Sequence, residues 1–369
     1  MELNELEPRI RAAWQGRVSG CMLGKAIEVF SMTAGRDALV DYLERARALP
    51  LRDYIPYTDD APEALFRPSC RGCFDASAPD DDINYSVLAL ELLEAHGSAL
   101  STEHVARAWL NRLPVGATFT AERAAYRTLL LKADEWFPQG ASPGFDLALC
   151  SDNPYNEWIG AQIRADVYGW VTPGDPDLAS RLAGVDAGLS HRGDGVYGAV
   201  LVAAWGASIP VAQDLDSALS RACEHIPADS GAAAAVALGR ELAQTGEGPG
   251  QIHEQYATLS PVHTLNNLAL VVWSLLRHPD DFSAAIGEVV TAGWDTDCNG
   301  AMDRPMARTH RGFPRGAGSA EPGRHHGKNR RRRSCDRVTS QRAARANLPT
   351  GRVTTRIACI FSYLMGDFA

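Results

Sequence analysis

The sequence predicts an all-α fold, and three observations lead to that prediction. Segments with apolar residues at helical spacing follow one another along most of the 369 residues, separated by Gly, Pro or Asp. The alanine-rich segment 231–238 follows Asp229-Ser230, a typical helix cap, and is the clearest helix. We find no run of alternating strand-like residues. The expected helices span about residues 6–24, 102–113, 120–135, 178–191, 198–208, 214–225, 231–244, 263–277 and 281–292.

The first expected helix carries Gly16, Gly20 and Gly24, four residues apart and therefore on one face. A glycine inside a helix costs roughly 1 kcal/mol relative to alanine. Three glycines on one helix face therefore indicate that a neighbouring helix or a ligand comes close to this face. The segment 50–82 contains five prolines and little periodicity, so we expect a long structured loop there.

Two acidic clusters lie far apart in the sequence. Asp80-Asp81-Asp82 leads into the apolar run 83–93, which is expected to be a buried helix. The second cluster lies in Gly293-Trp294-Asp295-Thr296-Asp297-Cys298-Asn299-Gly300. Each has a plain structural explanation: acids favour helix N-termini, and Asp-Thr-Asp can form an Asx turn. Together, however, their five carboxylates suit a pair of Mg²⁺, Mn²⁺ or Ca²⁺ ions, which need several oxygen ligands from different segments.

Charge divides the chain near residue 301. Residues 1–301 hold 21 basic and 41 acidic residues, a formal charge of −20, whereas residues 302–369 hold 15 and 4, a charge of +11. We therefore expect one domain over 1–301 and an Arg-rich, disordered tail over 302–369 that resembles out-of-frame translation. An acidic body argues against nucleic-acid binding, except through the tail.

The beginning of the chain has no basic and apolar signal-peptide pattern, and no stretch of about 18 apolar residues suggests a membrane span. The eight scattered cysteines are accordingly read as reduced thiols. We expect a cytoplasmic protein that does not bind membranes.

Several motifs resemble the ADP-ribosylglycohydrolase family over about residues 10–301. The resemblance rests on Gly20-Cys21-Met22-Leu23-Gly24-Lys25-Ala26-Ile27-Glu28, Pro79-Asp80-Asp81-Asp82-Ile83-Asn84-Tyr85, Gly160-Ala161-Gln162-Ile163-Arg164-Ala165-Asp166, Leu189-Ser190-His191 and Gly293-Trp294-Asp295-Thr296-Asp297. It implies a single compact orthogonal helical domain with two Mg²⁺ or Mn²⁺ ions. The metal ligands that it implies are Asp80, Asp81, Asp82, Asp295, Asp297 and Cys298.

Two of these positions depart from the family's pattern. Asp80 and Cys298 stand where threonines are usual, and a thiol is a poor ligand for magnesium. Lys25 stands where many members have aspartate. A second Thr-Asp-Asp, at 58–60, is rejected as the first cluster because Ala61-Pro62 and a loop follow it.

The resemblance also implies a reaction. A metal-activated water would attack the anomeric carbon of an ADP-ribose joined to a modified protein or a small molecule. Glu28 and Asp81 are the expected catalytic residues. The expected substrate-binding residues are Gly160, Arg164, His191 and Asn299. Core burial for His191 and a structural ion pair for Arg164 remain alternatives. For the whole chain, the alternatives are a catalytically silent ADP-ribose-binding or structural protein, and a product disabled by its altered C-terminus.

Overall fold

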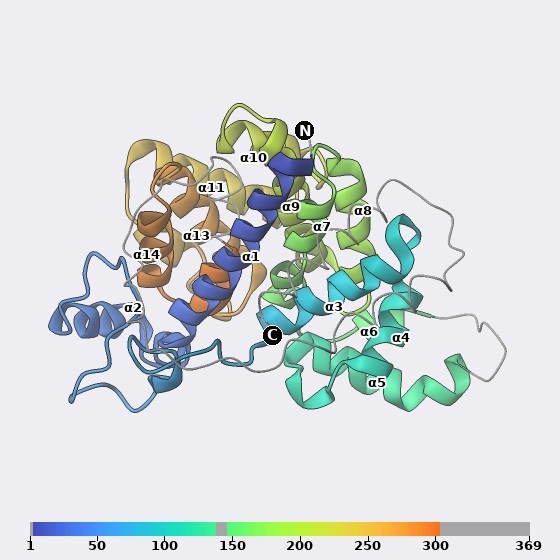
Figure 1. Ribbon diagram of the computed structural model, residues 1–369, viewed down its shortest axis with the longest axis horizontal. Helices are drawn as coiled ribbons and strands as arrows, with labels where there is room; N and C mark the ends of the chain where they lie inside the picture. Colours follow the sequence, from blue (N-terminus) through green and yellow to red (C-terminus); the bar gives the residue numbers. More distant parts are fainter. Residues whose placement is uncertain (1–2, 138–145, 303–369) are drawn as a thin grey trace, which may run out of the picture.

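The computed structural model describes residues 3–137 and 146–302, and these residues form an all-α fold, as predicted. Within them, the only β-pairing is an isolated bridge between Trp158 and His263. Figure 1 shows the arrangement of the helices. The α-helices are α1 (Leu3–Lys25), α2 (Glu28–Arg45), α3 (Asp81–His96), α4 (Thr102–Arg112), α5 (Thr120–Trp136), α6 (Ala148–Ser151), α7 (Asp166–Val171), α8 (Pro176–Ala187), α9 (Gly193–Ser208), α10 (Leu215–Cys223), α11 (Gly231–Thr245), α12 (Gly250–Gln255), α13 (Thr264–Arg277) and α14 (Phe282–Ala292). Short 3₁₀ helices are η1 (Arg67–Ser69), η2 (Gly97–Ala99), η3 (Val115–Ala117), η4 (Ile159–Arg164) and η5 (Ile209–Val211).

Most of the expected helices are present, and the differences have local causes. Helix α2 was not predicted, because Gly35 interrupts it with a φ of 84° and its apolar spacing is irregular. Helix α9 begins at Gly193, earlier than the predicted residue 198, because three glycines in its first two turns hide the apolar pattern. The loop predicted over 50–82 is confirmed up to Asp80, with only η1 inside it.

Helix α9 is the centre of the core. It packs against α7, α8, α10 and η4, and nearly all of its residues after Tyr197 are buried. Gly193–Val211 is also the one described segment that is long and apolar enough to cross a membrane, whereas no such segment was expected from the sequence. However, 72% of this apolar stretch is buried inside the molecule. Its apolar surface is therefore used in the core.

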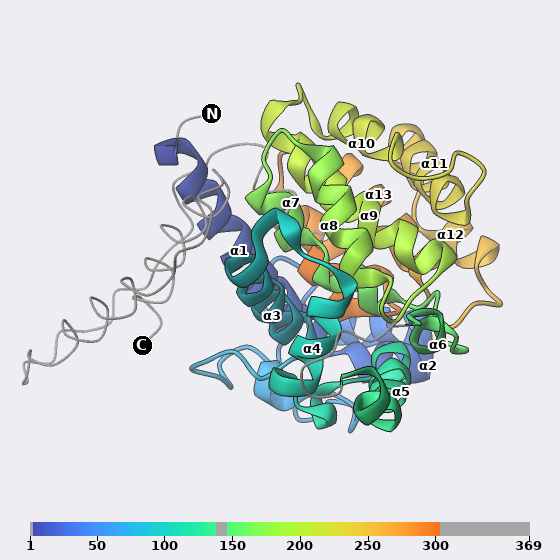
Figure 2. The ribbon, with the colours of Figure 1, turned by 90° about the vertical axis from the view of Figure 1, so that its right-hand side faces the viewer.

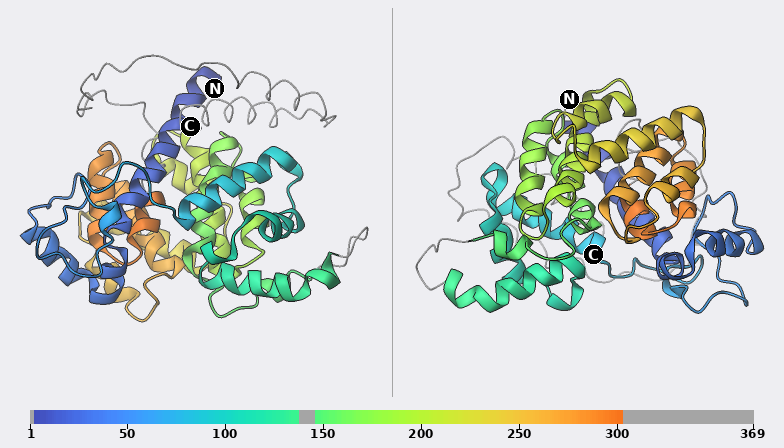
Figure 3. Two further views of the ribbon diagram at one scale, coloured as in Figure 1. Left: turned by 60° about the horizontal axis from the view of Figure 1, so that its bottom comes forward. Right: turned by 180° about the vertical axis from the view of Figure 1, so that it is seen from behind.

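The helices gather into neighbouring groups. Helices α11 and α13 pack together, and α13 also packs on α14. Figure 2 shows α4, α5 and α6 at one end of the molecule, away from α10 and α11. From behind, in the right panel of Figure 3, the yellow and orange helices adjoin the green ones. Helix α1 contacts α2, α3 and α14, so it connects the N-terminal and C-terminal parts of the described chain.

The glycine face of α1 packs directly on the backbone of a last helical stretch, residues 296–302. A Cβ at Gly20 would overlap the carbonyl oxygen of Gly300, and one at Gly24 would overlap that of Thr296. The Thr296 hydroxyl also donates a hydrogen bond of 2.8 Å to the Gly24 carbonyl oxygen. The predicted close approach is therefore confirmed for Gly20 and Gly24, and its partner is the helical stretch that follows Asp295 of the second acidic cluster.

The described residues end within the helical stretch 296–302. Ala301 and Met302 are fully buried, and the Met302 sulfur accepts a 3.2 Å hydrogen bond from Gln162 Nε2. Residues 303–369, nearly all of the predicted Arg-rich tail over 302–369, lie outside the described residues.

Substitution of Gly20 by alanine tests the close packing. We expect Gly20→Ala to lower the free energy of unfolding by about 1–3 kcal/mol, because the methyl group has no space between the two backbones. Gly184→Ala in α8 is the matched control, since its Cβ would make an ordinary contact of 3.6 Å with Val200. The control should be neutral or stabilising, as is usual for glycine in a helix. Urea unfolding curves measure both variants, and equal stability of the two would contradict this account.

Candidate functional site

A cavity of about 600 Å³ lies where the two acidic clusters meet. The end of α1, the start of α2 and the start of α3 form one side, and the start of α5 with η4 forms another. The turn before the last helical stretch completes the wall. The lining residues are Lys25, Glu28, Val29, Met32, Pro79, Asp80, Asp81, Asn84, Ala117, Phe119, Thr120, Glu122, Trp158, Ile159, Gly160, Ile163, Val262, Asp295, Asp297 and Cys298.

Asp80 serves both as a helix cap and as part of the cavity wall. Its Oδ1 accepts a 2.9 Å hydrogen bond from the Asp82 backbone N–H and so caps α3, while Oδ2 pairs with the Lys25 ammonium. Asp81 and Asp82 follow in the first turn, where the helix dipole favours carboxylates. The capping explanation and the cluster therefore both apply to the same residues.

One stripe of α1 faces these acids. Arg17, Cys21 and Lys25 are four residues apart, so they lie on one helix face. Arg17 Nε donates a 3.0 Å hydrogen bond to the Asp82 carbonyl oxygen, and its other nitrogens lie 3.3 Å from Asp82 Oδ1 and 2.7 Å from Asp166 Oδ2. This buried guanidinium fixes the start of α3 against α1 and α7. No site role was predicted for Arg17 or Cys21, although their four-residue spacing is visible in the sequence.

The second cluster is held by a strained turn. Gly293 and Trp294 have φ values of 88° and 61°, and the Trp294 ring stacks on His253 at 3.9 Å between ring centres. Asn267 supports the turn from α13: its side-chain oxygen accepts hydrogen bonds from Asn299 Nδ2 at 2.8 Å and from the Asp295 N–H at 3.4 Å. The turn thus directs the Asp295 and Asp297 side chains toward α3.

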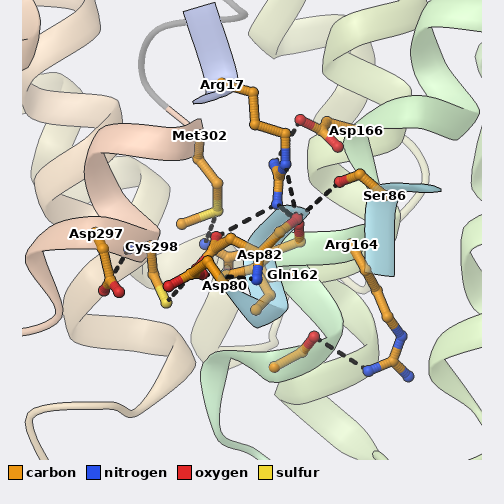
Figure 4. A network of polar contacts seen from close by, with 12 residues as sticks. Arg17, Asp80, Asp82, Ser86, Gln162, Arg164, Asp166, Asp297, Cys298 and Met302 are labelled. Atoms are coloured by element: carbon orange, nitrogen blue, oxygen red, sulfur yellow. Dashed lines mark hydrogen bonds and ion pairs between the residues drawn. The ribbon is translucent and has the colours of Figure 1, made fainter. Parts of the chain in front are cut away.

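The two clusters converge into two groups of candidate metal ligands. In each group, one ligand atom per residue lies within 4.8 Å of every other. The first group is Cys21, Asp80, Asp82 and Asp297, and the second is Asp295, Asp297 and Cys298. Figure 4 shows Cys298 beside Asp80 and Asp82, with its sulfur 3.5 Å from Asp82 Oδ2. Asp297 belongs to both groups.

The charge of the cluster fits divalent cations. Apart from Glu122, which has its own arginine partner, five carboxyl groups and the Lys25 ammonium line the cavity, and their formal charge is −4 when every carboxyl is ionised. Burial and mutual repulsion raise the pKa values of Asp81, Asp82, Asp295 and Asp297. Asp295 Oδ1 is buried and has no hydrogen-bond partner within the described chain. Two divalent cations would neutralise this charge and supply a partner for that oxygen.

Glu28 lies at the start of α2, on the wall beside the second cluster. Burial raises the pKa of Glu28 to about 11, and the nearby charges of Asp297 and Asp295 and a hydrogen bond to Asp297 contribute further. Without a cation, this carboxyl therefore holds its proton at neutral pH. Its position agrees with the predicted catalytic role, which remains a prediction.

Glu122 is a cavity carboxylate that the sequence analysis missed. It accepts a 2.5 Å hydrogen bond from Arg164 Nη1, and only a glycine at position 160 leaves room for its carboxylate. In the sequence, Glu122 resembles an ordinary acid in the first turn of an amphipathic helix, so no local signal distinguishes it.

The remaining predicted residues lie behind the cavity wall. Arg164 is fully buried and directs its guanidinium toward Glu122, Asp186 and Ser190, with Asp186 Oδ1 at 3.0 Å. His191 is buried beside them, 3.8 Å from Glu122 Oε1, and burial lowers its pKa so that the ring is neutral. Asp82 and Asn299 are buried as well and are absent from the lining residues. Of the predicted substrate-binding residues, only Gly160 lines the cavity, and substrate contact by the other three stays a prediction.

The raised pKa values predict a pH-dependent stability. A carboxyl whose pKa is higher in the folded state binds protons on folding, so its stabilising effect is complete below its unfolded pKa and is lost as the pH rises toward the folded value. For Glu28 this window extends from 4.5 to about 11. We expect the melting temperature of chelator-treated protein to fall between about pH 5 and pH 8, and Mg²⁺ or Mn²⁺ to raise it more at pH 8. A melting temperature that changes neither with pH nor on addition of these cations would contradict the interpretation of this cluster as a cation site.

The match to a family model agrees with the motifs. The sequence matches the ADP-ribosylglycohydrolase family over residues 2–302. A solved structure named "ADP-ribosylglycohydrolase-related protein complex" is similar, with 17% identity, a TM-score of 0.46, and coverage of 83% of this chain and 88% of that chain. No curated protein matches the sequence. Because the family match extends over nearly all of the described residues, the chain belongs to the ADP-ribosylglycohydrolase family.

Proposed function

We propose that this chain is a divalent-cation-dependent hydrolase that cleaves the glycosidic bond between ADP-ribose and a modified protein or small molecule. The observation that supports this most is the 600 Å³ cavity, whose acidic wall comes from two segments more than 200 residues apart in the chain. Its volume is in the usual range for small-molecule sites. Family membership supports the hydrolase class.

Asp80, Asp81, Asp82, Asp295 and Asp297 would hold the two cations, Mg²⁺ or Mn²⁺, with Cys298 at the edge of the set. When bound, such cations polarise substrate oxygens and lower the pKa of a bound water. The chain itself supplies the rigid frame, because the Arg17 guanidinium, the Asn267 amide and the α3 cap fix these side chains before any ligand arrives.

Glu28 is our candidate for general base. Once Asp295 and Asp297 are neutralised, part of the charge that raises the pKa of Glu28 disappears. The carboxylate can then accept the proton of the water that attacks the anomeric carbon. The carboxylates around it would stabilise the positive charge that develops on the sugar ring.

The opposite wall supports a nucleotide substrate. Phe119 is 52% exposed, and Trp158 and Val262 also line this side of the cavity. An exposed aromatic ring at a cavity rim offers a face on which a nucleobase stacks. On this proposal the adenine lies toward Phe119 and the terminal ribose toward the acids.

A second candidate function is ADP-ribose binding without turnover. The observation in its favour is Lys25, whose ammonium occupies one oxygen of Asp80 in the first ligand group. Turnover of an ADP-ribosylated protein, measured as released ADP-ribose with and without Mg²⁺ or Mn²⁺, separates the two functions. We propose a cytoplasmic location for either, supported by the free thiols of the described cysteines.

Substitutions in the acidic wall test the hydrolase proposal. We expect Asp81→Asn and Asp297→Asn each to lower the rate of ADP-ribose release at least about 100-fold, because a cation ligand and a charge are lost together. Asp59→Asn is the matched control, as it changes the same residue type in the exposed Thr58-Asp59-Asp60 loop. Full activity in both cavity variants would exclude the proposal.

Substitution of Phe119 tests the orientation of the nucleotide. Phe119→Ala should weaken ADP-ribose binding roughly tenfold through loss of stacking. Leu131→Ala, which removes a 75% exposed apolar side chain elsewhere on α5, should not change binding. Calorimetric titration measures both variants, and identical affinities would place the nucleobase elsewhere.

A further inference from the structure

We propose that this cation site is a mixed sulfur and oxygen site, in which Cys21 and Cys298 each give a thiolate to one of the two cations. The site therefore selects thiophilic divalent metals such as Zn²⁺ or Co²⁺ over Mg²⁺. This inference rests on the proposed function, since it concerns the same cluster, but it names a metal class that an all-oxygen site would not prefer.

The two sulfur atoms lie among the candidate metal ligands. Each of the two ligand groups contains exclusively carboxylates and one cysteine: Cys21 with Asp80, Asp82 and Asp297, and Cys298 with Asp295 and Asp297. All ligand atoms within a group are within 4.8 Å of one another. Tetrahedral zinc, with bonds of about 2.3 Å to sulfur and about 2.0–2.2 Å to oxygen, needs a sulfur-to-oxygen separation of about 3.6 Å. Small side-chain movements would therefore close each group around an ion.

Two oxygen atoms of the first ligand group already have cationic partners. The Lys25 ammonium occupies Asp80 Oδ2, and the Arg17 guanidinium lies 3.3 Å from Asp82 Oδ1. Magnesium prefers oxygen ligands and binds thiolate poorly, whereas zinc is satisfied by four ligands that include sulfur. Each thiol that binds releases its proton to solvent, and the thiolate charge then faces the cation.

The cluster also contains a ligand atom without a hydrogen-bond partner. Asp295 is 3% exposed, and its Oδ1 has no hydrogen-bond partner within the described chain. This oxygen belongs to the same residue that shares a group with Cys298. A buried carboxylate oxygen without a partner is costly unless an ion satisfies it.

Cobalt spectroscopy on the full chain tests the inference without any activity measurement. Chelator-treated protein is titrated with Co²⁺ alone, and the near-ultraviolet thiolate-to-cobalt charge-transfer band is recorded. We expect the band in the unmodified chain, a reduced band in Cys21→Ser and in Cys298→Ser, and its loss in the double variant. Cys150→Ser is the matched control, because Cys150 is a buried free thiol on α6 that belongs to neither ligand group.

Competition gives the selectivity. Zn²⁺ should displace Co²⁺, and Mg²⁺ at the same concentration should not. In either cysteine variant the preference for Zn²⁺ over Mg²⁺ should fall at least about tenfold, since even the loss of an outer-shell partner weakens metal binding 10–100-fold.

The outcomes separate this inference from the proposed function. Stoichiometric Co²⁺ uptake without the band, or a band unchanged in all variants, overturns the sulfur ligands and leaves the cation site intact. Absence of binding by Co²⁺, Mn²⁺ and Mg²⁺ in calorimetry overturns the proposed function as well. Should a cysteine variant fail to fold, X-ray absorption of the zinc-loaded unmodified chain replaces it: sulfur at about 2.3 Å supports the inference, and an oxygen-only shell refutes it.

Discussion

The structure depends on one electrostatic constraint, the burial of many carboxylates at a single point. Asp80, Asp82, Asp295 and Asp297 are each at most 5% exposed, and repulsion among them opposes folding. The chain partly offsets this repulsion with Arg17 and Lys25, which come from the same face of α1. Such an arrangement is unfavourable without compensation, because buried charges need partners. The charge that remains is the basis of the cation site proposed for this cluster.

The packing of α1 brings the buried carboxylates of the two clusters together. One face of the helix carries the residues that meet the first cluster, and the glycine face lies against the helix that follows the second cluster. A single rigid element thus brings together segments separated by more than 200 residues. The two functions of α1 require different residue types at the same four-residue spacing, so Gly20 and Gly24 are each followed directly by a residue of the other face, Cys21 and Lys25.

A second buried network supports the other side of the cavity. Arg164 bonds Glu122, Asp186 and Ser190, and the Tyr168 hydroxyl donates a 2.8 Å hydrogen bond to Asp186 Oδ2. Because every member is bonded to another, the network is rigid and keeps Glu122 at the cavity wall. Arg164 therefore acts on the cavity through Glu122, a relation that the linear order of these residues does not reveal.

The sequence by itself determined the helical class, most helix positions, the close approach at Gly20 and Gly24, and the pairing of two acidic clusters. These features follow from local rules: helical periodicity, the conformational cost of glycine, and the preference of hard cations for oxygen. Only the tertiary structure decided which acids face the cavity and that Glu122 joins them. It also decided that Cys21, which does not line the cavity, lies beside Asp80, Asp82 and Asp297. Such properties depend on the relative rotation and packing of distant helices, and no local pattern around Cys21 or Glu122 specifies that rotation.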